Sequence, residues 1–269
     1  MSPSPRRILV TGGGSGIGFA IARRLARAGD HVVLASRDPG RVDAARRILV
    51  DEGCSCSAHA CDVRDPDAVA HLFDAAGDLD VLVNNAAGNF VCPSIDLSPN
   101  GFRAVVESSL HGSFFCSQAL ARQTIARGSS GVILNLVATY AWTGAPGVAH
   151  SAAAKAGLVA LTKTLAREWA PHGIRVNALA PGFVATDSAR ANILTDPEAE
   201  ERMRSLIALG RFADEDEIAA AAAWLVSDEA SYCTGAVLTV DGGRSLGVAM
   251  HGVADGENHK DSSRHAAGN

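Results

Sequence analysis

Seven short apolar runs recur along this chain of 269 residues, and stretches with helical spacing separate them. Strands that alternate with helices in this way predict parallel β-α-β units. The runs are RRILV, HVVLAS, CSAHAC, DVLVN, GVILNLV, IRVNALA and AVLTV. We therefore expect an α/β fold, a doubly wound parallel sheet with helices on both of its faces.

The stretches between the runs supply the expected helices. Apolar residues recur at helical spacing over 16–28. The pair Ser98-Pro99 is typical of a helix start, because serine caps and proline fits the first helical position, so one long helix is predicted toward Arg127. Residues 152–170 are rich in alanine and leucine and predict a second long helix, which Pro171 ends.

One domain accounts for most of the chain, because 269 residues are few for two domains that each carry a dinucleotide site. We expect a flexible N-terminus over 1–5, a single domain over 6–247 and a polar, disordered tail over 248–269. The segment from about 183 to 210 lacks a strand pattern and carries charged helical pieces. Its position after the sixth run makes it a candidate lid.

The overall charge and the N-terminus exclude several classes of partner. A net charge of -5 and a pI of about 6.0 provide no basic stripe for nucleic acid. The apolar run before the first glycines is far shorter than the roughly 20 residues of a membrane span, and we find no signal peptide. We expect a cytoplasmic protein with no nucleic-acid or membrane partner.

The six cysteines form no C-x-x-C pair and no dense framework, which favours a reduced protein. Cys54, Cys56 and Cys61 lie close together in sequence and allow two interpretations: a metal site, or small buried side chains. A Cys-x-Cys pair on a strand points both thiols to one face of the sheet, so we favour buried side chains and expect no metal.

A glycine-rich segment, Thr11 to Gly18, follows the first run and opens the first helix. Glycines 12, 16 and 18 allow a tight turn and a close approach of the backbone to a pyrophosphate at the positive end of the helix. Because the pattern lies between a strand and a helix, it predicts a Rossmann-type dinucleotide site. The alternative is a glycine-rich turn that binds no ligand.

The end of the second run, Ser36-Arg37-Asp38, indicates which dinucleotide is bound. Arg37 can pair with a 2'-phosphate, and it would have no such partner on NAD, so we favour NADP(H). An acidic residue near this position can instead hold the ribose hydroxyls of NAD, so Asp38 keeps NAD open. The other interpretation of Asp38 is a solvated turn residue or a helix cap before Pro39.

Further motifs resemble those of the short-chain dehydrogenase/reductase family over residues 7 to about 245. They are Asp62-Val63, Asn84-Asn85-Ala86-Ala87-Gly88, Pro181-Gly182 and Asp241-Gly242-Gly243. The resemblance implies that Lys155 contacts the nicotinamide ribose. It also implies contacts in four groups: Gly12, Ser15, Gly16, Ile17 and Gly18 at the pyrophosphate; Asp62 and Val63 at the adenine; Asn84, Ala86 and Gly88 at the ribose; Pro181, Gly182, Val184 and Thr186 at the carboxamide.

The catalytic set of most family members is incomplete in this chain. Those members carry a Tyr-x-x-x-Lys pair, but here Ser151 stands four residues before Lys155. Ala138 stands where the family has a serine, and Ser109 stands where it has an asparagine. A serine hydroxyl is a poor replacement for a phenol, whose pKa of about 10 a nearby ammonium can lower.

A narrower resemblance, to the 2,4-dienoyl-CoA reductases, accounts for these differences. In that group the catalytic tyrosine stands fifteen residues before the lysine, and Tyr140 matches it here, with Ser151 as a further site residue. The alternatives are that Tyr140 is a packing aromatic next to Trp142 and that Lys155 is a surface lysine. The matching segments are NNAAGNFVCP, LSPNGF, GSFFCSQA and NLVATYAWTGAPGVAHSAAAKAG.

Two expectations concern individual positions of this set. Tyr140 stands two residues after Ala138, so an extended strand would point both side chains to the same side. The reductases have an asparagine where this chain has His111, so this imidazole is either a hydrogen-bond donor in the active site or a structural helix histidine.

The resemblance implies an NADPH-dependent reductase of 2,4-dienoyl thioesters that acts through a dienolate stabilised by Tyr140. Two alternatives stay open: a reductase of another enoyl or carbonyl substrate, polyketide-like or carrier-bound, and a non-catalytic NADP-binding protein. Family members pair their two long helices across subunits, so we expect a homotetramer whose other partner is a small acyl thioester.

Overall fold

The computed structural model describes residues 5–186 and 196–247. Within them, seven parallel strands form one sheet in the order β3-β2-β1-β4-β5-β6-β7, so the predicted doubly wound sheet is confirmed. The strands are β1 Arg7–Thr11, β2 His31–Ser36, β3 Cys56–Ala60, β4 Val81–Asn84, β5 Gly131–Leu136, β6 Ile174–Pro181 and β7 Val237–Val240. The predicted tail and residues 187–195 of the candidate lid lie outside the described residues.

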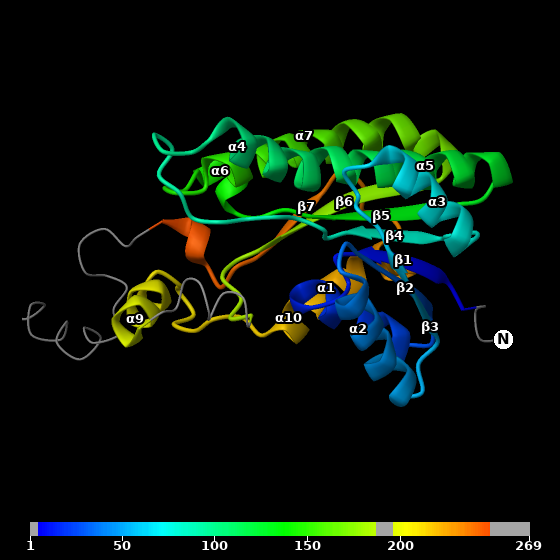
Figure 1. The fold of residues 1–269 in the computed structure, drawn as a ribbon, viewed down its shortest axis with the longest axis horizontal. Coiled ribbons are helices and arrows are strands. Elements are labelled where there is room, and N and C mark those ends of the chain that lie inside the picture. The colour runs from blue at the N-terminus through cyan, green and yellow to red at the C-terminus, as the bar shows by residue number, and fades with distance from the viewer. Residues whose placement is uncertain (1–4, 187–195, 248–269) are drawn as a thin grey trace, which may run out of the picture.

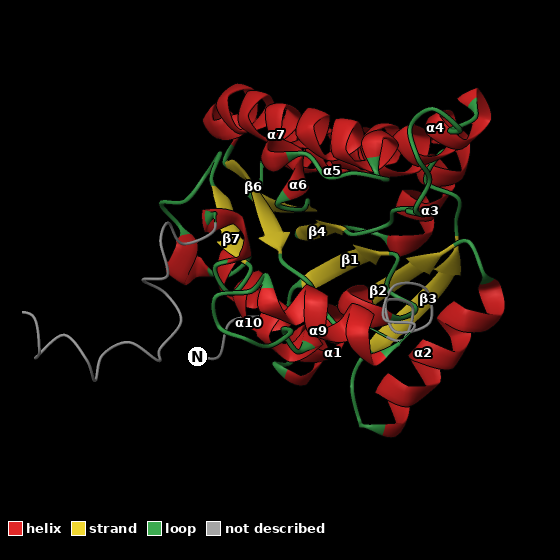
Figure 2. Ribbon diagram, turned by 90° about the vertical axis from the view of Figure 1, so that its left-hand side faces the viewer, coloured by secondary structure: helices red, strands yellow, loops and turns green. Residues whose placement is uncertain are grey.

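Helices cover both faces of the sheet (Figures 1 and 2). On one face lie α1 Gly16–Arg27, α2 Pro39–Asp51 and α10 Glu215–Leu225. On the other lie α3 Pro66–Ala76, α4 Pro99–Val106, α5 Gly112–Arg127 and α7 Ala149–Trp169. Shorter segments are η1 Glu107–His111, α6 Tyr140–Thr143, η2 Ala170–His172, α9 Pro197–Ser205, η3 Asp228–Ala230 and η4 Arg244–Leu246.

The long helix expected from Pro99 to Arg127 is continuous in direction but not uniform. Ser98 caps it as predicted, accepting a hydrogen bond from the Gly101 N–H at 3.0 Å. A π-helical turn, η1, separates α4 from α5, and apolar spacing carries no signal for such a wider turn. Directly after it Gly112 packs on the loop after β3, where a Cβ would lie 2.5 Å from Val63 Cγ2.

The site-forming part of the sheet is its middle, where the strand order reverses between β1 and β4. Thr11 and Asn84, the last residues of these strands, are paired in register. In open parallel sheets, ligands bind beyond the carboxyl ends of the strands at such a reversal. The fold therefore places the candidate site over β1 and β4.

Among the described residues, no helix is long and apolar enough to cross a membrane. The same part of the chain contains no cluster of three or more histidine, cysteine or acidic side chains that could hold a metal ion. Its six cysteines are free thiols, of which Cys61 and Cys116 are buried.

Candidate cofactor and active site

The turn between β1 and α1 is closed so tightly that three of its glycines, Gly12, Gly13 and Gly18, have no room for a side chain. A Cβ on Gly18 would lie 2.3 Å from Asn85 Nδ2 and 2.4 Å from the Gly12 carbonyl oxygen. Gly12 has a φ of 65°, a conformation that favours glycine. The Asn85 amide donates to the carbonyls of Thr11 and Gly12, both at 3.2 Å, and so ties the turn to the end of β4.

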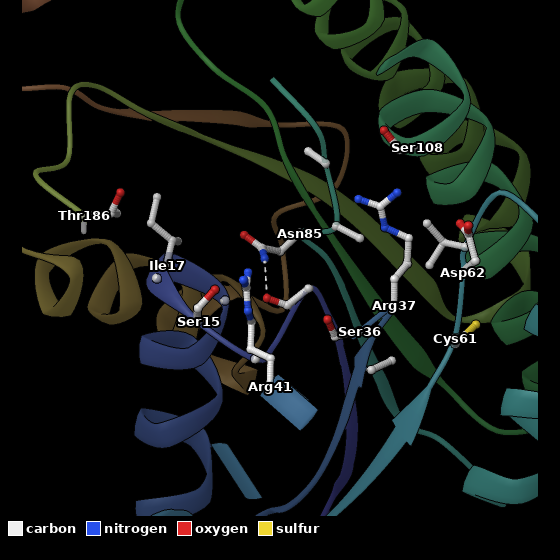
Figure 3. A pocket seen from close by; sticks show the side chains of 18 residues that line it. Ser15, Ile17, Ser36, Arg37, Arg41, Cys61, Asp62, Asn85, Ser108 and Thr186 are labelled. Carbon is white, nitrogen blue, oxygen red and sulfur yellow. Dashed lines mark hydrogen bonds between the residues drawn. The ribbon is translucent and has the colours of Figure 1, made fainter. Parts of the chain in front are cut away.

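A cavity of about 330 Å³ opens above this turn, at the carboxyl ends of β1 to β4 (Figure 3). Ten of the predicted cofactor residues line it: Gly12, Ser15, Gly16, Ile17, Gly18, Arg37, Asp62, Val63, Ala86 and Thr186. Eight further residues that were not predicted from the sequence also line it: Gly14, Ala35, Ser36, Arg41, Cys61, Asn85, Ala87 and Ser108.

Two arginines, at the end of β2 and the start of α2, bring guanidinium groups to this cavity. Arg37 and Arg41 both line it, and Figure 3 shows their side chains on the β2 side. Asp38 caps α2 instead, accepting a hydrogen bond from the Arg41 N–H at 3.0 Å. Of the two interpretations of Asp38, the structure therefore shows the helix cap. The position of Arg41, four residues after Arg37 and one turn into a capped helix, could have indicated it.

Asp62 presents an ionised carboxylate to the cavity. Hydrogen bonds from the Arg64 guanidinium hold the pKa of this carboxyl below its usual range, and the charge of Arg37 acts in the same direction. Figure 3 shows the Asp62 and Arg37 side chains on the same side of the cavity.

Asn84, predicted at the ribose, lies inside the protein and not in the cavity. It is 2% exposed, and its amide donates to Asn135 Oδ1 and Ser117 Oγ, both at 2.9 Å. Successive side chains of a strand point to opposite faces, so Asn84 turns toward α5 and β5 while Asn85 reaches the cavity. Asn84 thus contributes a buried amide that links β4 to β5 and α5.

The three predicted catalytic residues Tyr140, Ser151 and Lys155 are brought together by α6 and α7. Tyr140 Oη lies 3.0 Å from Ser151 Oγ, and the two hydroxyls share a hydrogen bond. Lys155, 6% exposed and one turn along α7 from Ser151, donates from Nζ to the Leu136 carbonyl at 2.5 Å. Lys155 is therefore a buried lysine at the end of β5 and not a surface lysine.

Burial determines the protonation states of Tyr140 and Lys155. It raises the pKa of Tyr140, against the opposing effect of the Ser151 hydrogen bond, so the phenol keeps its proton at neutral pH. Burial also lowers the pKa of Lys155 to about 8, which leaves the ammonium charged at neutral pH but close to losing its proton. The arrangement pairs a protonated phenol with the Ser151 hydroxyl and places the Lys155 ammonium one helical turn further along α7.

The expected extended path from Ala138 to Tyr140 is wrong. The strand β5 ends at Leu136, Thr139 has helical backbone angles, and Tyr140 is the first residue of the short helix α6. The helical turn, and not strand alternation, directs the phenol toward Ser151.

Among the described residues, no hydrogen bond or ring contact joins His111 to Tyr140, Ser151 or Lys155. The His111 side chain is exposed in a groove between α5 and α7, with its ring centroid 6.4 Å from that of Phe115. Of the two interpretations, its position corresponds to a helix-surface histidine.

Four further predicted cofactor residues, Gly88, Pro181, Gly182 and Val184, do not line the cavity. A Cβ on Gly88 would lie 3.6 Å from the Oγ of Ser108, which lines the cavity. Pro181 is the last residue of β6, and a Cβ on Gly182 would lie 2.6 Å from the backbone of Asp241. Val184 is buried and forms an isolated bridge with Ala213.

A family model described as enoyl-(acyl carrier protein) reductase matches residues 12–245, which include the glycine turn, the cavity and the α6–α7 group. The chain belongs to the short-chain dehydrogenase/reductase family. As a member of this family it is an oxidoreductase, and the predicted family membership is confirmed.

Relatives in the short-chain dehydrogenase/reductase family are named for dienoyl reduction. A Bacillus subtilis (strain 168) protein, named probable 2,4-dienoyl-CoA reductase, (2E)-enoyl-CoA-producing, is 44% identical over 246 residues, covering 90% of this chain and 97% of that one. A Rattus norvegicus protein, named peroxisomal 2,4-dienoyl-CoA reductase, (3E)-enoyl-CoA-producing, is 42% identical, covering 87% of this chain and 82% of that one.

Solved structures of the same family share the fold. A short chain dehydrogenase from Bacillus anthracis superposes with a TM-score of 0.83 at 41% identity, covering 91% of this chain and 98% of that one. A protein from Agrobacterium tumefaciens, solved with bound NADP, gives a TM-score of 0.85 at 38% identity with the same coverage.

Proposed function

We propose that this protein is an NADPH-dependent reductase of 2,4-dienoyl thioesters. The observation that carries the proposal is the pair of hydroxyls Tyr140 and Ser151, 3.0 Å apart beside the buried Lys155. This group stands in place of the Tyr-x-x-x-Lys pair of most family members, as the resemblance to dienoyl reductases requires. Relatives that carry that name at 42 to 44% identity support the same substrate class.

The residues of the cavity fit NADP. The glycines of the turn expose their backbone directly to the cavity. The Ser15 side chain, at the start of α1, makes no capping hydrogen bond within the described residues. The N–H groups of the first turn therefore face a pyrophosphate position. Arg37 and Arg41 suit a 2'-phosphate, whereas the carboxylate of Asp38 is engaged as a helix cap. A bound NADPH would supply the hydride for the reduction.

Tyr140 acts in this proposal as the hydrogen-bond donor to the thioester oxygen. Negative charge develops on that oxygen as the conjugated chain is reduced, and a preorganised donor stabilises it. Because Tyr140 donates to the substrate, Ser151 donates to the phenol oxygen, which fits the lowering effect of that bond on the pKa of Tyr140. The Lys155 ammonium adds a positive charge and binds the nicotinamide ribose. A proton taken up at carbon then converts the dienolate into an enoyl thioester.

The first test is the oxidation of NADPH by the purified protein with 2,4-hexadienoyl-CoA, with NADH and a simple ketone in parallel. Turnover of the dienoyl thioester with NADPH, and little with the ketone, is expected. Proton NMR of the product would distinguish a 2-enoyl from a 3-enoyl thioester by its double-bond position, because the two isomers have the same mass. NADPH binding without turnover of any conjugated thioester would contradict the proposed reaction and leave a non-catalytic NADP-binding protein.

Replacement of Tyr140 by phenylalanine tests the donor role. We expect the Tyr140→Phe protein to keep its NADPH affinity and to lose about 10²-fold or more in kcat, because the main donor to the oxyanion is removed. The only other tyrosine in the chain, Tyr232, is fully exposed, so Tyr232→Phe is the matched control and should keep full activity. Near-normal turnover by the Tyr140→Phe protein would contradict the assignment.

A second candidate substrate is an enoyl thioester on a carrier protein, since the family model that matches the chain is described by that activity. A crotonyl carrier protein and crotonyl-CoA, assayed beside the dienoyl thioester, would separate the two. His111 lines the groove between α5 and α7 and not the cofactor cavity, so its position does not favour this candidate.

We propose in addition that a second copy of the chain covers the groove between α5 and α7, as part of a homotetramer. Its lining is largely apolar: Leu110, His111, Phe114, Phe115, Gly157, Ala160, Leu161 and Thr164. The cytoplasmic location stays a prediction.

A further inference from the structure

The carboxylate of Asp62, which lines the cofactor cavity, is fixed by Arg64, an arginine outside the described lining. The Arg64 Nε donates to both carboxylate oxygens at 3.0 Å, and Nη2 donates to Oδ2. The backbone N–H of Arg64 donates to Oδ1 at 3.1 Å. Such a multidentate arrangement restricts the carboxylate to one orientation before any ligand is bound.

The orientation of the carboxylate determines which hydrogen-bond donors of a ligand it can accept. Asp62 is ionised and acceptor-only, so it favours a ligand group that donates a hydrogen bond and repels one that presents an oxygen. At the adenine end of a nicotinamide dinucleotide, the exocyclic amine is such a donor. In a hypoxanthine cofactor a carbonyl oxygen replaces this amine.

We propose that Arg64 is a positioning residue for adenine: it holds Asp62 so that the carboxylate accepts a hydrogen bond from the adenine amine, and it thereby makes the pocket selective against hypoxanthine cofactors. The inference rests on the proposed NADPH cofactor. It concerns the base and is independent of the acyl substrate.

A direct contact of Arg64 with the 2'-phosphate is the competing role, and two observations disfavour it. The guanidinium is already paired with Asp62, and Glu107 of η1 adds a second negative charge near it. Arg37 and Arg41, in contrast, both line the cavity. Removal of Arg64 should therefore affect recognition of the base more than recognition of the phosphate.

The test compares the Kd values of NADPH and of its deaminated analogue, which carries hypoxanthine, measured by cofactor fluorescence. For Arg64→Gln we expect NADPH to bind about tenfold more weakly, the size of one charge-assisted hydrogen bond, and the analogue to change little. The matched control is Arg47→Gln, which removes a similar arginine–aspartate pair, to Asp43 on α2, away from the cavity. Asp62→Asn should remove the same selectivity, with no further loss when combined with Arg64→Gln.

Equal weakening of both cofactors by Arg64→Gln would overturn the proposal, because it would indicate a phosphate contact or a general loss of loop structure. Unchanged binding of both would also overturn it. Melting temperatures of the Arg64→Gln and Arg47→Gln proteins show whether the fold is intact. Failure to bind NADPH at all would overturn the proposed cofactor together with this role, whereas selective binding without dienoyl turnover would overturn only the proposed reaction.

Discussion

At the scale of a residue, Lys155 shows how burial tunes the charge of a side chain in the proposed active site. The side chain is 6% exposed, and burial lowers its pKa to about 8. Below pH 8 the ammonium is charged and would donate to the ribose of the proposed cofactor, and as the pH rises through about 8 it loses this charge. We expect the Kd of NADPH to rise by about tenfold between pH 7 and pH 9.5, the loss of one charge-assisted hydrogen bond. Fluorescence titration across this range measures the change.

The control for this prediction is Lys155→Met, which has a similar shape and no titratable group. Its NADPH affinity should be weak at pH 7 and independent of pH up to 9.5. An equally steep pH dependence in the Lys155→Met protein would assign the titration to another group.

The protonation of a second buried side chain, His150, affects the stability of the fold. Its side chain is 0% exposed, neither ring nitrogen makes a hydrogen bond with the described residues, and its ring centroid lies 4.4 Å from that of Phe90. Burial lowers its pKa. The neutral ring is therefore favoured in the folded state.

The consequence for His150 is a loss of stability in acid. Above the unfolded-state pKa of about 6.5 both states hold a neutral ring, and below it the unfolded state binds the proton more readily, so the free energy of unfolding falls as pH drops. We expect a smaller fall between pH 7.5 and pH 5 for His150→Phe than for the parent, measured by urea unfolding. Parallel curves for the two proteins would show that His150 does not contribute.

At the scale of an element, the turn from β1 into α1 depends on the absence of a Cβ at Gly18, whereas the start of α2 does not depend on its glycine. A Cβ on Gly40 would meet only Asp38 Oδ1, at 3.4 Å. We expect Gly18→Ala to lower the free energy of unfolding by about 1 to 3 kcal/mol through overpacking. Gly40→Ala should raise it by about 0.4 to 1 kcal/mol, because alanine reduces the entropy of the unfolded chain. Urea unfolding of both variants checks the contrast, and a stable Gly18→Ala protein would show that the turn relaxes.

The elements were predictable from sequence because buried parallel strands form continuous apolar runs, and all seven runs became strands. Details that depend on the direction of one side chain could not be predicted in this way. Whether Asn84 or Asn85 faces the cavity depends on where β4 ends, and a shift of one residue exchanges their roles. The catalytic position of Tyr140 was predicted from its spacing to Lys155 in the resembling family. The apolar pattern gives no signal for the helical turn that begins at this residue.

At the scale of the whole molecule, the groove between α5 and α7 exposes apolar side chains that a monomer would leave in contact with water. A largely apolar groove on one side of the protein is typical of a contact between copies. Ala160 lies in this groove and is exposed, so an arginine there would place a charge in the contact without disturbing the core. We expect light scattering to give the parent a mass that is a multiple of 27.7 kDa and the Ala160→Arg protein a smaller one.

The matched control is Ala126→Arg, which adds the same charge at an exposed position of α5 outside the groove and should keep the parent mass. Comparable melting temperatures for both variants would assign the change in mass to the contact and not to unfolding. A parent that is monomeric at micromolar concentration would contradict the proposed assembly, as would an Ala160→Arg protein of unchanged mass. The NADPH affinity of a dissociated Ala160→Arg protein would then show whether the catalytic helix α7, which carries Ser151 and Lys155 on its buried side, keeps its position without a neighbour.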